Sequence, residues 1–135
     1  EKNISLKIDI SNKIILENIN RDLLFQMIYN LVNNAIRYNK PSGFIHIVNR
    51  INPDGSYDID LIDSGIGIPK EDVGTIFNRF KKANQSEDSA GYGLGLSIVK
   101  SIADYHKIAI SISSEIAKGT TFTISFPAEL IRFLT

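Results

Sequence analysis

The sequence predicts an α+β domain: a two-layer α/β sandwich in which three helices cover one face of a mixed, mostly antiparallel sheet. Stretches in which apolar and polar residues alternate, as in a half-buried strand, are separated by stretches in which apolar residues recur at helical spacing. Strand-like stretches also follow one another in hairpin order, and one pair is joined by Pro53-Asp54-Gly55-Ser56. Short connections of this kind favour antiparallel pairing.

The elements follow from local patterns along the chain. Asn18 to Asp22 offer several N-cap candidates, and Pro41 and Gly43 end the first helix. In the first half of the chain, the patterns predict a half-buried strand over 4–10, an extended piece over 14–17, a helix from the cap to about Tyr38, and strands over 44–51 and 57–62. They next predict a helix over 69–82, a polar loop over 83–90, and a helix that follows Gly91-Tyr92-Gly93-Leu94-Gly95 and ends near His106. The last elements are strands over 108–112 and 121–126 and a tail over 129–135 that is a short helix or a frayed end.

The bulk composition excludes several classes of protein. The chain has 135 residues, which suits one domain over 1–135, and its 15 basic and 15 acidic residues give no net charge, so nothing favours a nucleic-acid partner. It has no cysteine, which excludes disulfides and thiolate zinc sites. Its apolar runs are too short to span a bilayer. Because it begins at Glu1 rather than Met, we expect a fragment of a longer protein.

A polar stripe lies on the first predicted helix. Asn30, Asn34 and Arg37 recur at helical spacing beside the apolar stripe that contains Leu31 and Ala35. Asparagine is a poor helix former, so three of them within five residues need an explanation. An amide oxygen is a ligand that Mg²⁺ accepts beside phosphate oxygens and water. The alternative is a solvated helix end, and this segment alone does not decide between them.

Two glycine-containing motifs carry further chemistry. Asp63-Ser64-Gly65-Ile66-Gly67 follows a strand, and its carboxylate suits an exocyclic amine such as adenine N6, although a plain turn has the same pattern. Gly91-Tyr92-Gly93-Leu94-Gly95 precedes an apolar helix, where backbone N–H groups favour an anion. It is neither a Walker A loop nor a dinucleotide fingerprint. A flexible hinge explains it equally well.

Taken in order, these motifs resemble the catalytic and ATP-binding domain of sensor histidine kinases. Residues 30–38 resemble the N box of that family, 63–68 the G1 box, 76–82 the F box, 91–96 the G2 box, and 119–122 the closing glycine-threonine motif. The resemblance covers nearly the whole chain and implies the Bergerat ATP-binding fold. It also implies a role in two-component signal transduction with ATP and Mg²⁺ as ligands.

The resemblance assigns roles at the phosphate end of the nucleotide. It implies that Asn34 ligates Mg²⁺, that Asn30 supports the phosphates or the water shell of the metal, and that Arg37 contacts phosphate oxygens. Lys82 would polarise the γ-phosphate. The run Gly91, Tyr92, Gly93, Leu94, Gly95 and Leu96 would bind the nucleotide, with its glycines and Leu96 over the triphosphate, and residues 83–92 would form an ATP lid.

The resemblance also assigns roles at the adenine end. Asp63 would accept a hydrogen bond from adenine N6, and Thr121 would lie close to it. Tyr38 would pack near the adenine or the ribose. The remaining predicted contacts are the walls of the base pocket, Gly65, Gly67 and Ile68.

One position distinguishes this chain from related ATPases. Gyrases, Hsp90-type chaperones and MutL-type ATPases place a glutamate, as general base for water, where this chain has Asn30. An amide cannot accept a proton at neutral pH. We therefore expect phosphoryl transfer to a nucleophile brought from elsewhere rather than efficient hydrolysis.

The chain departs from the family pattern at two turns. His106-Lys107-Ile108 replaces the usual His-Gly-Gly, and Ala117-Lys118-Gly119 replaces the usual Gly-x-Gly. The phosphoacceptor histidine is missing, because neither His46 nor His106 has its sequence context. In the family it lies on a separate dimerisation domain.

These observations define the expected partners and the alternatives. We expect ATP, the dimerisation domain of the full-length kinase and, indirectly, a response regulator as partners, with this fragment a monomer and a cytoplasmic part of a parent that is membrane-anchored or not. The enzyme alternative is an anti-sigma-type protein-serine kinase on the same fold. The non-enzyme alternative is an inactive, nucleotide-gated docking module.

Overall fold

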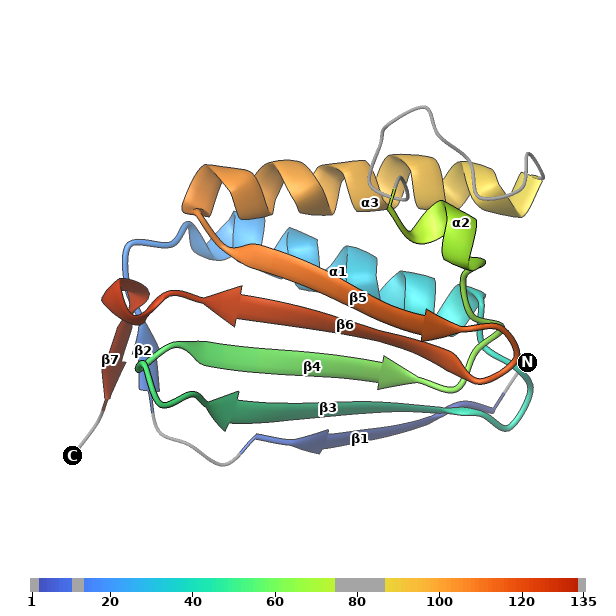
Figure 1. The fold of residues 1–135 in the computed structure, drawn as a ribbon, viewed down its shortest axis with the longest axis horizontal. Helices are drawn as coiled ribbons and strands as arrows, with labels where there is room; N and C mark the ends of the chain where they lie inside the picture. The colour runs from blue at the N-terminus through green and yellow to red at the C-terminus, as the bar shows by residue number, and fades with distance from the viewer. Residues whose placement is uncertain (1–2, 11–13, 75–86, 134–135) are drawn as a thin grey trace.

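The computed structural model describes residues 3–10, 14–74 and 87–133, with side chains in the last range described from residue 95 onward. Figure 1 shows two layers, helices above a sheet, as the sequence predicts. In chain order the elements are β1 (Ser5–Asp9), β2 (Ile14–Leu16), α1 (Arg21–Arg37), β3 (Phe44–Ile51), β4 (Tyr57–Asp63), α2 (Lys70–Val73), α3 (Glu87–His106), β5 (Ala109–Glu115), β6 (Gly119–Phe126), a 3-10 turn (Ala128–Leu130) and β7 (Ile131–Phe133).

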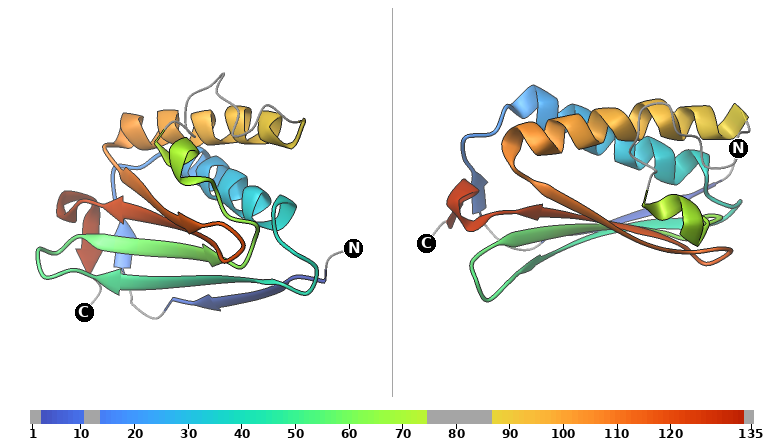
Figure 2. Two further views of the ribbon diagram at one scale, coloured as in Figure 1. Left: turned by 45° about the vertical axis from the view of Figure 1, so that its right-hand side comes forward. Right: turned by 45° about the horizontal axis from the view of Figure 1, so that its top comes forward.

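The main sheet has the strand order β1-β3-β4-β6-β5. β1 is parallel to β3, and the other neighbouring pairs are antiparallel, so the predicted mixed, mostly antiparallel sheet is confirmed. The two rotated views show α1 and α3 on the same face of this sheet (Figure 2). The tail is neither frayed nor wholly helical, because β7 pairs with β2 in a separate antiparallel ribbon.

Helix α1 begins and packs as its sequence predicts. The side chain of Asn20, its N-cap, accepts a hydrogen bond from the Leu23 N–H at 3.0 Å. Leu31 and Ala35, from the predicted apolar stripe, are buried in a core shared with α3 and the sheet. α1 and α3 therefore pack against each other, and they contact the sheet at β4 and β5 respectively.

His106 connects the two long helices. Its Nδ1 is 2.9 Å from the Ile102 carbonyl, which can only accept, so Nδ1 carries the proton. Its Nε2 then accepts from the Asn20 N–H at 3.0 Å. The sequence predicts only that the helix ends near His106, whereas this buried ring also satisfies a backbone donor at the start of α1.

The segment between α2 and α3 differs from expectation. α2 starts after Pro69 as predicted, but the rest of the predicted 69–82 helix beyond residue 74 lies outside the described residues, with its inward positions Ile76, Phe77 and Phe80. α3 begins at Glu87, so the prediction of a loop over 83–90 is wrong for 87–90, and the glycines of residues 91–95 lie inside the helix. Acidic residues at 87 and 88 suit a helix N-terminus, which offsets the low helical propensity of glycine.

Strand β1 is exposed rather than half-buried. All five of its residues are exposed, and Leu6 and Ile8 retain 56% and 58% of their accessible surface. Alternation places these two side chains on the helix side of the sheet, but α1 does not reach far enough to cover the edge strand. Among the described residues, no helix combines the length and apolar composition needed to cross a membrane.

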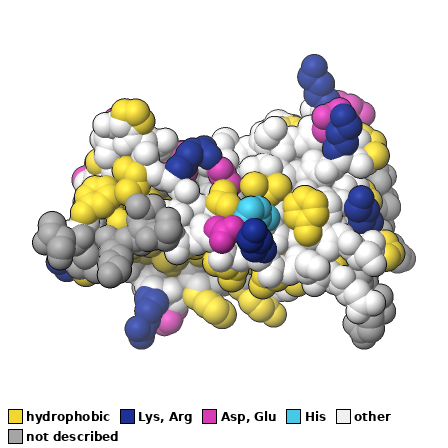
Figure 3. All heavy atoms as spheres, turned by 90° about the horizontal axis from the view of Figure 1, so that it is seen from below, with side chains coloured by type: hydrophobic (Ala, Val, Ile, Leu, Met, Phe, Trp, Pro, Cys, Tyr) yellow, Lys and Arg dark blue, Asp and Glu magenta, His cyan; other side chains and the backbone are white. Residues whose placement is uncertain are grey.

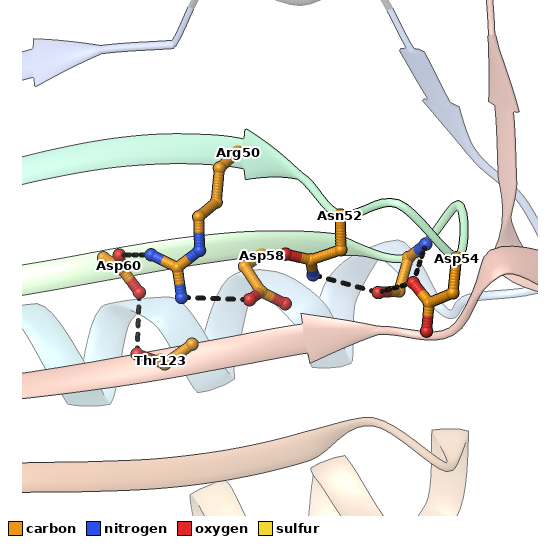
Figure 4. Close-up of polar contacts among 7 residues, drawn as sticks. Arg50, Asn52, Asp54, Asp58, Asp60 and Thr123 are labelled. Carbon is orange, nitrogen blue, oxygen red and sulfur yellow. Dashed lines mark hydrogen bonds and ion pairs between the residues drawn. The ribbon is translucent and has the colours of Figure 1, made fainter.

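The face of the sheet that the helices do not cover contains a buried charge cluster (Figure 4). Asp58 and Asp60 of β4 are both buried, and Arg50 of β3 bridges them, at 3.1 Å to Asp58. Thr123 of β6 donates to Asp60 at 2.7 Å. Pairing with one guanidinium makes the burial of two carboxylates tolerable.

The two departures from the family pattern both occupy left-handed backbone. Lys107 ends α3 with φ of 61°, and Ala117 in the β5–β6 turn has φ of 69°. A side chain in this region costs roughly 1–2 kcal/mol, whereas glycine adopts it freely. The chain therefore carries local strain at the two positions where the pattern implied by the resemblance has glycine.

We expect Lys107→Gly to raise the free energy of unfolding by about 0.5–1 kcal/mol, because it removes this strain while adding some chain entropy to the unfolded state. Urea denaturation followed by circular dichroism measures the change. Lys100→Gly is the matched control: Lys100 is an exposed residue inside α3, where the same substitution should lower stability by about 1 kcal/mol. Destabilisation by both variants would contradict the assignment of strain to Lys107.

Candidate functional site

A small cavity opens where the C-terminal ends of α1 and β4 meet the start of β6. The loop that follows β4 closes it on one side. Its lining is apolar except for an amide, a carboxylate and two hydroxyls: Asn34, Ala35, Tyr38, Asp63, Ile66, Gly67, Ile68, Thr120 and Phe122. The structure thus brings Asn34, Tyr38, Asp63, Gly67 and Ile68, all predicted site residues, around one cavity.

Asp63 is the acidic group of this cavity. Its Oδ1 accepts two backbone hydrogen bonds, from Gly65 N–H at 2.8 Å and from Thr120 N–H at 3.2 Å. Its second oxygen, Oδ2, accepts no hydrogen bond from the described residues. One oxygen is therefore fixed by the protein, and the other remains available to a donor in the cavity.

The surroundings of Asp63 affect its protonation. Burial raises the pKa of the Asp63 carboxyl above its ordinary value, and the two backbone N–H donors oppose this rise. A donor at Oδ2 would lower the pKa again, because it stabilises the carboxylate. A ligand that donates a hydrogen bond would therefore stabilise the charged form of the Asp63 carboxyl.

Two glycines permit the close approach of the backbone segments around Asp63. Gly67 has φ of 81°, and a Cβ there would lie 2.3 Å from the Glu115 carbonyl oxygen. Gly119 has φ of 122°, and a Cβ there would lie 2.0 Å from the Asp63 carbonyl oxygen. Any other residue would push the loop or β6 away from the carboxylate.

Hydrogen bonds to three other segments hold the loop that forms one wall of the cavity. Ile66 N–H donates to the Tyr38 carbonyl at 3.0 Å, and Ala117 N–H donates to the Ile66 carbonyl at 2.8 Å. Ser114 Oγ, on β5, accepts from Ile68 N–H at 2.8 Å. The loop after Asp63 is therefore held to α1, to β5 and to the β5–β6 turn.

Sequence reasoning missed Ser114 and Thr120. The hydroxyls of these two residues lie 2.7 Å apart, and Thr120 lines the cavity. Thr121, predicted to lie near Asp63, is partly exposed and pairs with Ile62 on the open face of the sheet. Strand alternation could have identified Thr120, because it lies two residues before the apolar Phe122 and therefore shares its buried face.

The two asparagines of α1 lie beside α3. Asn30 Nδ2 donates to the Gln26 carbonyl at 2.9 Å, and a Cβ at Gly95 would lie 3.7 Å from Asn30 Oδ1 and 3.9 Å from Asn34 Nδ2. Asn34 is buried, and its Nδ2 has no hydrogen-bond partner among the residues that the structure describes. A buried amide without a partner is costly, so a polar ligand at this position would relieve the cost.

Other predicted residues lie apart from the cavity or outside the described part. Arg37 lies 5.6 Å from the centre of the Tyr38 ring and lines an apolar groove beside β1. Leu96 is fully buried in the core. Gly65 contributes its N–H to Asp63. Lys82 is not among the described residues, and for the run of Gly91, Tyr92, Gly93 and Leu94 only the helical backbone is described.

The cavity has the chemistry of a site for a flat base that bears an amine. The carboxyl residue Asp63 lines it together with small and apolar residues, and amides lie toward α3. Among the described residues, no group of three or more His, Cys, Asp or Glu side chains is arranged to hold a metal ion. A divalent ion here would therefore need ligand oxygens from a bound molecule as well as an amide.

The chain covers part of much longer sequence relatives. It is 34% identical over 106 residues to the adaptive-response sensory kinase SasA of Synechococcus elongatus, and 41% identical over 107 residues to the sensor-like histidine kinase SenX3 of Mycolicibacterium smegmatis. These matches cover 78% of this chain but only 27% and 28% of the relatives. The chain thus spans about a quarter of their length.

Solved structures share the fold. The catalytic domain of histidine kinase ThkA superposes with a TM-score of 0.77 at 28% identity, over 94% of this chain and 82% of that one. The mycobacterial sensor histidine kinase MprB has a TM-score of 0.80 at 22% identity, over 97% and 86% of the two chains. Full-length ShkA, solved in complex with AMPPNP, has a TM-score of 0.77 at 23% identity over 99% of this chain and 27% of that one.

A family profile matches most of the chain. It covers residues 19–130, from the cap of α1 to the turn before β7, and therefore includes every residue that lines the cavity. The chain belongs to the family of histidine kinase-, DNA gyrase B- and HSP90-like ATPases, and its relatives within that family are sensor histidine kinases.

Proposed function

We propose that this domain binds ATP with Mg²⁺ and presents the γ-phosphate to a histidine on a separate dimerisation domain of a two-component sensor kinase. The observation that carries the proposal is the state of Asp63, which lines the apolar-walled cavity with its Oδ1 held by two N–H groups and its Oδ2 without a hydrogen bond from the described residues. Adenine N6 donates a hydrogen bond, whereas guanine has an acceptor oxygen at the equivalent position. A carboxylate therefore favours adenine over guanine.

The adenine base would lie in the cavity, between the loop that follows β4 and the residues of α1 and β6 that line it. Ile68 and Ala35 are both buried and line the cavity, where they would contact the faces of the ring. Gly67 would let the ring approach the backbone. Tyr38, which also lines the cavity, would contact the base or the ribose.

The phosphates would then extend toward α3. The buried Asn34 Nδ2, which has no partner among the described residues, would donate to a phosphate oxygen, and the oxygen of the same amide is an acceptable ligand for Mg²⁺ beside phosphate oxygens. Asn30 would support the phosphates or water around the metal. When bound, Mg²⁺ would neutralise charge that develops on the phosphates. Arg37 and Lys82 remain predicted phosphate contacts.

In the proposed reaction, a nitrogen of the acceptor imidazole attacks the γ-phosphorus. A phosphorus–nitrogen bond forms, the bond from the γ-phosphorus to the bridging oxygen breaks, and ADP leaves. The domain itself would position the phosphates. It would not activate water for hydrolysis, because the Asn30 amide cannot accept a proton and so cannot act as a general base. Support for a histidine acceptor comes from the relatives, which are named as sensor histidine kinases.

Calorimetric titration with ATP, ADP and GTP, with and without Mg²⁺, tests the proposal. We expect ATP and ADP to bind at least about tenfold more tightly than GTP, because the base is read by one charge-assisted hydrogen bond. Asn34→Ala should remove most of the Mg²⁺-dependent gain and change metal-free binding little. No binding of any nucleotide would favour a docking module, and rapid hydrolysis would contradict the inference from Asn30.

Asp63→Asn should weaken ATP binding by about ten- to a hundredfold, because an amide presents its NH₂ to the N6 donor and a charge-assisted hydrogen bond is lost. Since burial raises the pKa of Asp63, wild-type binding should also fall, as pH decreases, at a higher pH than an ordinary carboxyl would give. Asp104→Asn, on the exposed face of α3, is the matched control. Equal ATP affinity for Asp63→Asn and wild type would overturn the adenine assignment.

Ser114→Ala tests whether the loop must be held for binding. The variant leaves Ile68 N–H and the Thr120 hydroxyl without their partner, so we expect ATP affinity to fall about fivefold. Ser113→Ala is the matched control, because Ser113 is the exposed neighbour on the opposite face of β5. Thermal unfolding of both variants separates loss of fold from loss of affinity. An equal effect of both on affinity would refute this positioning role.

A further inference from the structure

The exposed edge of β1 is the largest feature that the nucleotide site leaves unexplained. Leu6, Ile8 and Ile10 retain 56%, 58% and 45% of their accessible surface, and all three lie on one side of the strand. Leu6 also lines an apolar groove that reaches α1, where Val32 and Ile36, which is 44% exposed, line it. Figure 3 shows hydrophobic side chains around a small group of histidine, acidic and basic side chains on this side of the molecule.

The backbone of β1 is open along the same edge. Ser5 N–H donates to the Gly43 carbonyl, and the parallel register continues through Lys7 and Asp9. In a strand, alternate residues direct their backbone groups to opposite sides, so Leu6, Ile8 and Ile10 direct theirs away from β3. No other strand among the described residues pairs with this edge.

The opposite edge of the sheet differs. β5, the other edge strand of the main sheet, packs against α2 and α3, whereas the main contact of β1 is β3 alone. Edge strands are commonly protected by a covering element, a proline or a bulge, because an open edge is a template for pairing. Residues 4–10 contain no proline.

We propose that β1 pairs with β1 of a second copy of this chain, antiparallel and centred on Ile8, so that two sheets form one continuous sheet across a two-fold axis. Ile8 then faces Ile8 of the partner copy, and Leu6 faces Ile10. These are the residues whose backbone groups point outward, so each pair exchanges both of its hydrogen bonds. The apolar side chains meet over the groove beside α1.

Charge selects this register. Centring on Ile8 places Lys7 of each copy opposite Asp9 of the other, in the closely spaced pairs that lack backbone hydrogen bonds. Centring on Lys7 would instead place two lysines opposite each other, which is unfavourable. The hydrogen bond from His46, at 2.9 Å, lowers the pKa of the Asp9 carboxyl. The Lys7 ammonium of the same chain lies 3.6 Å from this carboxylate, so Asp9 is charged and has basic neighbours within its own chain. A dimer replaces the monomer that we expect from the sequence.

Sedimentation equilibrium over a range of concentrations, without nucleotide, tests the dimer. We expect a monomer–dimer equilibrium in which Lys7→Glu or Asp9→Lys raises the dissociation constant about tenfold, because each change places like charges opposite each other twice. The double variant, Lys7→Glu with Asp9→Lys, should restore dimerisation. Lys118→Glu is the matched control, with the same charge change at an exposed turn.

Cross-linking tests the register directly, since the natural chain has no cysteine. Opposite residues in a non-hydrogen-bonded pair have Cα atoms about 4.5 Å apart, within the range of a disulfide. A mixture of Lys7→Cys and Asp9→Cys chains should therefore oxidise mainly to the mixed dimer. Preferential cross-linking of Lys7→Cys to itself would place the axis on Lys7. That result, a monomer at every concentration, or a dimer insensitive to the charge reversals would overturn the proposal.

Discussion

The hydrogen bonds accepted by Asp63 Oδ1 hold the site together. They join the loop after β4, through Gly65, to the first residues of β6, through Thr120, and so connect segments that lie far apart in sequence. Gly119 allows β6 to come this close. Because this oxygen is occupied by the protein, the carboxyl group cannot rotate freely, and its second oxygen has a fixed direction. The fold thus fixes the group that would recognise the base before any ligand arrives, which reduces the entropy lost on binding.

The helical wall of the site depends on a second polar link. His106 bonds to Ile102 at the end of α3 and to Asn20 at the start of α1, with a tautomer fixed by the carbonyl acceptor. The same two helices place Gly95 beside Asn30 and Asn34. A link at one end of the helix pair thus helps to set the register in which α1 and α3 present their polar residues at the other end. Neither His106 nor Asn20 lines the cavity.

The sequence predicted features that local pattern and motif chemistry determine. The helix cap near Asn20, the hairpin of β3 and β4 and the strand over 121–126 all follow from spacing and turn residues, and the structure confirms them. Where prediction failed, the missing information was tertiary. Alternation gave β1 an apolar side but not whether α1 would cover it. The polar, aperiodic residues 83–90 indicated a loop that the helix would follow, although the helix begins at Glu87. Ser114 acts through Ile68, a contact between residues far apart in the chain.

The exposure of β1 follows from how the strand is attached. It is the parallel strand of an otherwise antiparallel sheet, and α1 lies in the connection that leads from it to β3. That helix packs over the centre of the sheet, where Leu31 and Ala35 are buried, and so cannot also cover the edge. An apolar side chain left in water at the edge gains nothing from folding alone. Keeping Leu6, Ile8 and Ile10 apolar is therefore explained most directly by a partner that buries them, and the opposite charges of Lys7 and Asp9 let an identical strand be that partner.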